Sequence, residues 1–178
     1  MIKYFLITIL SGIVFSLSAQ DANNDEYNKT TQHPETSKLM LTGKINQEGF
    51  QKINDFSEYY QEEYETYSPD IGPLMQILAK LESSNIRIIL GTWCIDSKQQ
   101  VPRFIKILEE LNYPVEEIEM LAVDHNLEAK GKANPVEDYN LKRIPTFIFY
   151  NQDGEEIGRI VESPEATLEE DILKIFNK

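Results

Sequence analysis

The sequence IRIIL at residues 86–90, followed directly by GTWCIDSK at residues 91–98, decides the fold. The first run is short, rich in β-branched residues and bounded by Asn85 and Gly91, which predicts a buried central strand. After it, apolar residues recur at helical spacing, namely Val101, Phe104, Ile105, Leu108 and Leu111. Cys94 is therefore expected at the N-terminus of a helix that follows a central strand.

A cysteine at such a corner is a candidate nucleophile. The unpaired amides and the positive end of the helix dipole stabilise a thiolate over a thiol. Asp96 opposes the thiolate and Lys98 partly compensates, although Asp96 can equally serve only to complement the helix start. The alternative is that Cys94 is a buried, inert small hydrophobe. The strand-to-helix corner and the adjoining Trp93 favour a functional thiol.

The flanking sequence predicts two helices before the central strand and more strands after it. An aromatic stripe marks the first helix and favours a core-facing side over a ligand groove; it consists of Phe50, Ile53, Tyr60, Tyr64 and Tyr67. The second helix is marked by Ile71, Leu74, Met75, Leu78 and Leu81. Further strands are predicted at Ile118–Val123, Thr146–Tyr150 and Glu156–Val161, and a last helix at Thr167–Phe176. Helical crossovers imply parallel pairing and the final hairpin is antiparallel, so we expect an α/β sandwich with a mixed central sheet and helices on both faces.

Two motifs resemble the thioredoxin family. The run from Trp93 to Lys98 (WCIDSK), with Pro102 eight positions after Cys94, is similar to the thioredoxin active-site helix, whose sequence is WCxxCK with a proline at that spacing. Arg143-Ile144-Pro145-Thr146, followed by an apolar strand and an Asn/Asp/Gly hairpin, resembles the segment whose cis proline packs beside the active cysteine. The resemblance implies a thioredoxin-like three-layer sandwich over residues 39–178, with the paired helices before Ile86 as an N-terminal helical extension.

The chain departs from the family pattern at positions that matter for mechanism. Ser97 replaces the second, resolving cysteine, so the motif is CxxS and cannot close its own disulfide. Ile88 stands where thioredoxins usually bury an aspartate that assists the resolving thiol. Glu162 or Ser163 stands where the family has a glycine that lets clients approach.

The resemblance implies thiol–disulfide exchange through a mixed disulfide, of the isomerase or monothiol type. We expect Trp93, Cys94, Ser97 and Pro145 to form the catalytic group, and Asp96, Ile144 and Thr146 to contact the substrate. In this scheme Cys94 attacks a client disulfide, Ile144 and Pro145 align the client as an added strand, and Ser97 hydrogen-bonds the sulfur. Two other functions remain open: a non-catalytic protein-binding module with a vestigial cysteine, and a thiol peroxidase, which the absence of a PxxxTxxC run disfavours.

Composition limits the partners. The formal net charge is −13 and the sequence pI is about 4.6, which leaves no basic surface for nucleic acid or anionic membranes. One cysteine allows neither an internal disulfide nor a four-cysteine zinc site. His125 next to Asp124 is a poor metal site and is expected to be an exposed loop histidine. We therefore expect no metal and no cofactor; the expected partners are proteins with disulfides or thiols, together with a small-molecule thiol.

The first residues predict export. Lys3, the apolar stretch Tyr4–Leu17 and the small residues Ser18 and Ala19 are typical of a signal peptide spanning residues 1–19. The apolar stretch is short for a membrane span, and an uncleaved anchor is the alternative. Residues 20–38 are polar and without period, which predicts a flexible tether. The expected location is the periplasm or the exterior.

Overall fold

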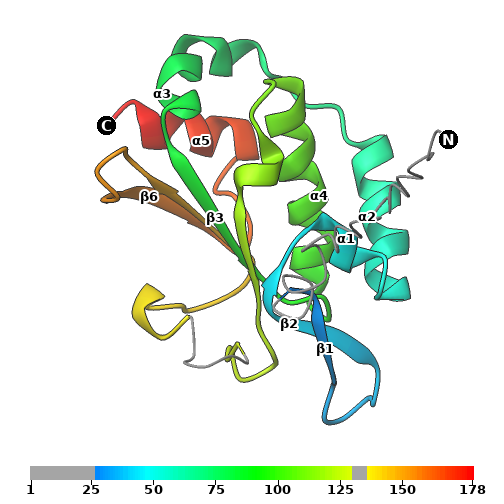
Figure 1. Ribbon diagram of the computed structural model, residues 1–178. Coiled ribbons are helices and arrows are strands. Elements are labelled where there is room, and N and C mark those ends of the chain that lie inside the picture. The colour runs from blue at the N-terminus through cyan, green and yellow to red at the C-terminus, as the bar shows by residue number, and fades with distance from the viewer. Residues whose placement is uncertain (1–26, 130–135) are drawn as a thin grey trace, which may run out of the picture.

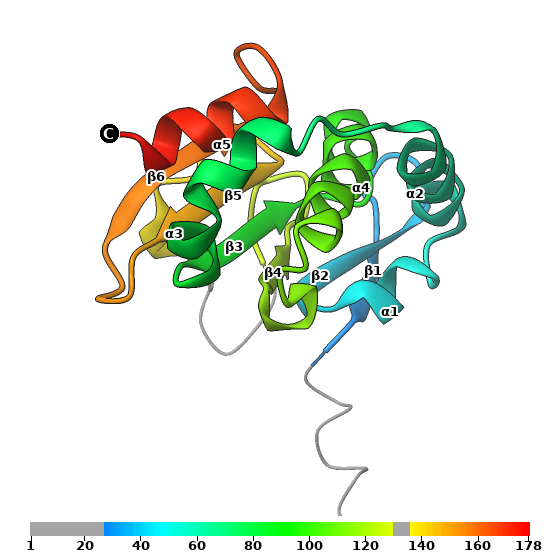
Figure 2. The ribbon, with the colours of Figure 1, turned by 90° about the horizontal axis from the view of Figure 1, so that it is seen from above.

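A six-stranded mixed sheet forms the centre of the computed structural model, which describes residues 27–129 and 136–178. The strands are β1 (Lys29–Gln32), β2 (Leu39–Ile45), β3 (Asn85–Leu90), β4 (Glu119–Ala122), β5 (Thr146–Tyr150) and β6 (Glu156–Val161). Their order across the sheet is β1-β2-β4-β3-β5-β6 (Figure 2). Only β3 and β4 pair in parallel, and the other neighbours are antiparallel, which confirms the mixed sheet.

The long helices all pack on one face of this sheet. The helical elements are α1 (Gln47–Phe50), α2 (Asn54–Thr66), η1 (Gly72–Ile77), α3 (Leu78–Glu82), α4 (Ile95–Glu110), η2 (Val115–Glu117), η3 (Glu137–Tyr139) and α5 (Leu168–Phe176). Figure 2 shows α2, α3, α4 and α5 together on the side that faces the viewer. Apolar side chains of these helices and of the sheet make one large core.

Helical cover on the second face is thin. In the described part of the chain it consists of the single-turn helix η3 and the segments 124–129 and 140–145, and η3 lies on the opposite side of the sheet from α4 (Figure 1). A smaller core lies there, built around Ile89, Leu121, Ile148, Val136 and Ile144. The expected sandwich of helices, sheet and helices is thus present, but its two helical layers are very unequal.

The apolar run at residues 86–90 fills both cores, as its composition predicts. Ile86, Ile88 and Leu90 point into the large core, whereas Ile89 points into the smaller one. A strand that is buried on both faces has no polar alternation. This placement puts the end of β3, and with it Cys94, at the centre of one sheet edge.

The tether prediction is wrong for part of its range. Lys29–Gln32 forms β1, which pairs with β2, although the segment is polar. Backbone hydrogen bonds to β2 stabilise it, and the buried Asn28 side chain adds two bonds to Asn46. The signal-peptide prediction for residues 1–19 and the start of the tether lie outside the described residues. Within the described part of the chain, no helix is long and apolar enough to cross a membrane.

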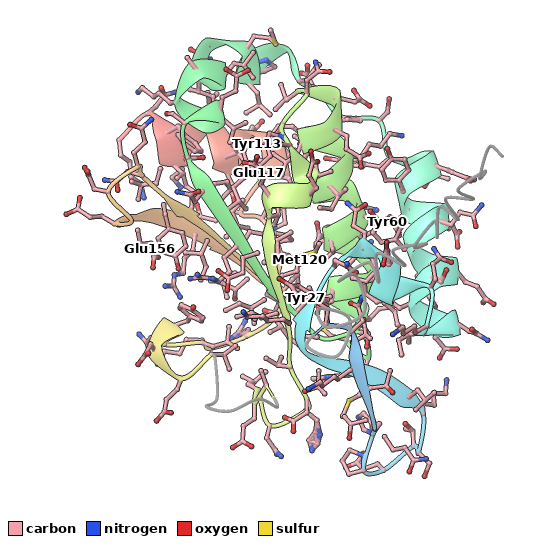
Figure 3. All side chains as sticks on the ribbon, in the orientation of Figure 1. Tyr27, Tyr60, Tyr113, Glu117, Met120 and Glu156 are labelled. Carbon is pink, nitrogen blue, oxygen red and sulfur yellow. The ribbon has the colours of Figure 1, made fainter. Side chains whose placement is uncertain are left out.

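The predicted aromatic stripe does face the core. It is split between α1 and α2, and Tyr60 lies in the space between α2 and α4 (Figure 3). Its ring centroid is 5.3 Å from that of Phe50 and 6.1 Å from that of Tyr64. Desolvation by burial raises the pKa of Tyr60, and the nearby Glu109 charge adds to that shift. The stripe is therefore packing that holds α2 against α4, not a ligand groove.

Candidate functional site

The candidate site is the corner where β3 passes into α4. Cys94 is the N-cap of α4, with extended backbone angles (φ −82°, ψ 131°). Its N–H donates to the Gly91 carbonyl at 2.9 Å, and its carbonyl accepts from the Lys98 N–H at 3.1 Å. These bonds place the cysteine at the first turn of a sixteen-residue helix, as the sequence predicts.

The thiol faces the loop that precedes β5. Sγ of Cys94 lies 3.6 Å from the Ile144 carbonyl oxygen and 4.0 Å from Oδ2 of Asp96. The cysteine is free and half-buried. The sulfur is thus packed against backbone on one side and retains access to solvent.

Pro145 lies at the bend of that loop. The Ile144–Pro145 peptide bond is cis, and the Pro145 carbonyl accepts from the Glu162 N–H at 2.7 Å. Glu162 has a φ of 67°, a left-handed backbone conformation that favours glycine. Its carboxylate pairs with Arg143 at 2.5 Å. The loop is therefore bound to the end of β6 by backbone and by charge.

Thr146 and Ser97 have contacts that differ from their expected roles. Thr146 is 1% exposed, and its hydroxyl donates to the Arg143 carbonyl at 2.6 Å, so it holds the loop from within. Ser97 is fully buried, and its Oγ accepts from the Gly91 N–H at 3.2 Å. Among the described residues no hydrogen bond joins Ser97 to Cys94. The expected bond to the sulfur is thus absent, because the Ser97 side chain points inward to the end of β3.

Trp93 contacts two histidines, His33 and His125, neither of which was predicted as a site residue. Nε1 of Trp93 donates to the Val123 carbonyl at 3.1 Å. The centroid of the Trp93 ring lies 6.1 Å from that of His33 and 6.3 Å from that of His125, both in edge-to-face geometry. The centroids of the two imidazole rings lie 5.3 Å apart. His125 is half-buried, not the exposed loop residue that was expected, because the β1–β2 hairpin covers it. Only the adjacency of His125 to a predicted strand end hinted at this position.

Gly91 allows the close packing at this corner. A Cβ there would lie 2.6 Å from Cδ1 of Ile144 and 2.8 Å from Nε1 of Trp93. Both distances are too short for a real contact, so any larger residue would displace the side chains on either side of Cys94.

The described residues contain no group of three or more His, Cys, Asp or Glu side chains that could hold a metal ion. The arrangement presents one thiol, a helix N-terminus and a backbone carbonyl beside a proline. Its chemistry is that of a thiol.

Comparisons with known proteins bear on this arrangement. A solved structure of a protein of unknown function from Pseudomonas aeruginosa is 18% identical, with a TM-score of 0.42 over 66% of this chain and 67% of that one. Thioredoxin from Fasciola hepatica is 17% identical, with a TM-score of 0.37 over 58% of this chain and 88% of that one. Mitochondrial thioredoxin 3 from Saccharomyces cerevisiae is 17% identical, with a TM-score of 0.32 over 56% of this chain and 86% of that one.

The search of curated proteins found no match. The family model described as thioredoxin matches residues 46–173. This match covers most of the chain, from the start of the helical extension to a point within α5, and includes the Cys94 corner and the Pro145 loop. The chain therefore belongs to the thioredoxin family.

Proposed function

We propose that the protein is an exported thiol–disulfide exchange protein that works through one nucleophilic cysteine, as a thiol–disulfide oxidoreductase or isomerase in the periplasm or outside the cell. The observation that carries the proposal is the position of Sγ of Cys94, at the N-cap of α4 and 3.6 Å from the Ile144 carbonyl beside Pro145. A helix N-terminus stabilises a thiolate, and a backbone carbonyl next to it can pair with an extended client.

The exchange step needs only the client disulfide. The Cys94 thiolate attacks one client sulfur, a new S–S bond forms, and the old S–S bond breaks. The electron pair leaves on the second client sulfur, which takes a proton from water. Release requires a second client thiol or an external small-molecule thiol, since Ser97 has no sulfur with which to attack the mixed disulfide.

Trapping experiments test this function. The full-length protein is mixed with a disulfide-bonded protein, and adducts are resolved without reductant. We expect adducts that persist until a small thiol is added, and none with Cys94→Ala. Ser97→Cys is expected to shorten adduct lifetime and raise disulfide reductase turnover, because the second thiol attacks intramolecularly.

The competing function is a thioredoxin-fold binding module with an inert cysteine. It is favoured by the packing of Cys94 against Ile144 within the smaller core. Alkylation separates the two functions: if Cys94 reacts with iodoacetamide no faster than a free peptide thiol and forms no adduct with any disulfide, the binding module is correct.

A further inference from the structure

A pocket of about 440 Å³ is lined in part by Trp93, the residue before Cys94. It is bounded by the β1–β2 hairpin, the turn between α1 and α2, and the start of α4. The residues that matter here are Lys38, Leu39, Lys52, Ile53, Trp93 and Lys98, and we call this site the Trp93 pocket. Its hairpin side precedes residue 46, where the thioredoxin match begins, so this wall is an addition to the matched region.

The Trp93 pocket carries positive charge on an acidic protein. Lys38 is paired with Asp55 at 2.5 Å, and that hydrogen bond lowers the pKa of Asp55, so these two charges cancel. Lys52 donates to the Asn28 carbonyl at 3.3 Å, and the Lys98 ammonium lies 4.9 Å from the centre of the Tyr59 ring. Within the described part of the chain, neither Lys52 nor Lys98 forms an ion pair. Three lysines therefore line the pocket against one carboxylate, Asp55, which is also within reach of the Lys98 charge, in a chain with net charge −13.

The remainder of the wall is apolar. Ile53 is buried, Trp93 is half-buried, and Leu39 is 53% exposed although it is aliphatic. A pocket of this size suits one or two side chains or a small molecule. The lysines and apolar side chains of the Trp93 pocket therefore suit a ligand that has a carboxylate next to an apolar group.

The Trp93 pocket also lies close to the nucleophile along the chain. Trp93 directly precedes Cys94, and Lys98 follows it by about one helical turn, a rise of about 6 Å. An extended polypeptide advances about 3.3 Å per residue. A client held at Cys94 can therefore reach the pocket with a residue within about four positions of its attacked cysteine.

We propose that the Trp93 pocket binds an acidic segment of the client, so that the preferred substrates are disulfide-bonded polypeptides with a carboxylate and an apolar residue next to the reacting cysteine. The assignment of the occupant as a client rests on the proposed function. Binding of the acidic peptide itself does not require the thiol.

The first experiment measures binding without thiol chemistry. Trp93 is the single tryptophan of the chain, so its fluorescence reports on the pocket directly. Two peptides with serine in place of cysteine are titrated into the full-length protein, one with two glutamates and a leucine beside the serine, the other with glutamines. We expect the glutamate peptide to bind about fivefold more tightly at low salt, with the difference fading as salt screens the charges.

Three variants locate the effect. Lys52→Gln and Lys98→Gln should each remove most of the preference for glutamate. Lys174→Gln removes the same charge from α5, in an exposed pair with Glu165, and should leave the preference intact. Equal binding of both peptides, or a preference that all three variants reduce alike, would overturn the proposal.

The second experiment uses the symmetric disulfides of the cysteine-containing peptides and measures the rate of adduct formation at Cys94. We expect the glutamate disulfide to react about fivefold faster, and Lys52→Gln to equalise the two rates. Adducts that form equally fast with both peptides refute the acidic client and leave the exchange function standing. If fluorescence shows binding of the glutamate peptide but no adduct forms, the exchange function is refuted and the proposal that the pocket binds acidic segments is kept.

Discussion

Ser97 has one role that its sequence position suggests and a different one that the structure shows. By sequence it is the missing resolving thiol, whereas in the fold it is a buried hydroxyl that accepts the Gly91 N–H. The end of β3 and the first turn of α4 are joined by that bond. Loss of this hydrogen bond should therefore lower the stability of the β3–α4 corner. It should have less effect on the reactivity of Cys94.

We expect Ser97→Ala to lower the free energy of unfolding by about 1–3 kcal/mol, because a buried N–H loses its partner. Urea unfolding followed by circular dichroism measures this change. Ser97→Cys keeps a weak acceptor and should lose less. Adduct formation at Cys94 should survive in folded Ser97→Ala; an unchanged stability would show that water replaces the hydroxyl.

Specific polar contacts join elements that are far apart in the sequence. Thr92 is 1% exposed, and its Oγ1 accepts from the Leu41 N–H at 3.0 Å, which ties β2 to the Cys94 corner. Tyr64 on α2 donates to the Glu109 carboxylate on α4. Each contact joins segments that are far apart in sequence, and each can be tested separately.

Thr92→Val should destabilise the protein by about 1–3 kcal/mol, because the valine has the same shape but leaves the Leu41 N–H without an acceptor. Thr92→Ser retains the oxygen and serves as the matched control. Thermal unfolding of the two variants provides the comparison, and equal losses in both would mean that the methyl group, not the oxygen, is what matters.

The Tyr64 contact should depend on alkaline pH. Its hydrogen bond to Glu109, followed by burial, raises the pKa of Tyr64 from 10.0 to about 12. The neutral phenol is the favoured form, so the stabilisation is fully present below pH 10 and is lost as the pH rises through 12.

Tyr64→Phe should therefore cost about 0.5–1 kcal/mol at neutral pH, a value reduced for solvent screening. The difference in free energy of unfolding between wild type and Tyr64→Phe should disappear as the pH rises above 10. Tyr59→Phe is the control on the same helix, because the Tyr59 ring stays beside Lys98. A gap that is constant through alkaline pH would argue against the Glu109 bond.

The parts of the fold that sequence reasoning found are those with apolar periodicity or a family motif. β3, β5, β6 and α5 appear within about a residue of their predicted bounds. β1 was missed because a polar edge strand is stabilised by backbone bonds, which leave no pattern in side chains. β2 was missed because Gly43 and Lys44 interrupt its alternation.

In the site too, the residues found from the sequence are those that belong to a family motif. Cys94, Ile144 and Pro145 could be associated because two motifs of a known family contain them. His33 and His125 could not, since 92 positions separate them and only the hairpin brings their rings together. Contacts between distant loops depend on tertiary packing, which no local spacing encodes.

At the scale of the whole molecule, the unequal cover of the two sheet faces should produce unequal local stability. The large core lies against α2, α4 and α5, whereas the helical cover described on the second face is the single turn of η3. The described parts of the chain on that face, residues 124–129 and 136–145, are mostly loop, with short-range backbone hydrogen bonds such as Asp124 N–H to the Glu128 carbonyl at 2.8 Å and Tyr139 N–H to the Val136 carbonyl at 3.2 Å. Segments of this kind open at low free energy.

Hydrogen exchange measured by mass spectrometry should show this difference. We expect amides at residues 124–128 and 137–143 to exchange much faster than those of β3, which pairs with a strand on both sides. Amides of α4 should be as protected as those of β3. Uniform protection over both faces would mean that the second face is held as firmly as the first.

The two outer strands of the sheet bear on how this protein avoids aggregation. β1 is four residues long and carries Lys29, and β6 carries the Glu156–Arg159 ion pair. Short, charged edges resist the addition of a strand from another copy of the chain. Both outer borders of the sheet therefore discourage edge-to-edge association between copies of this chain.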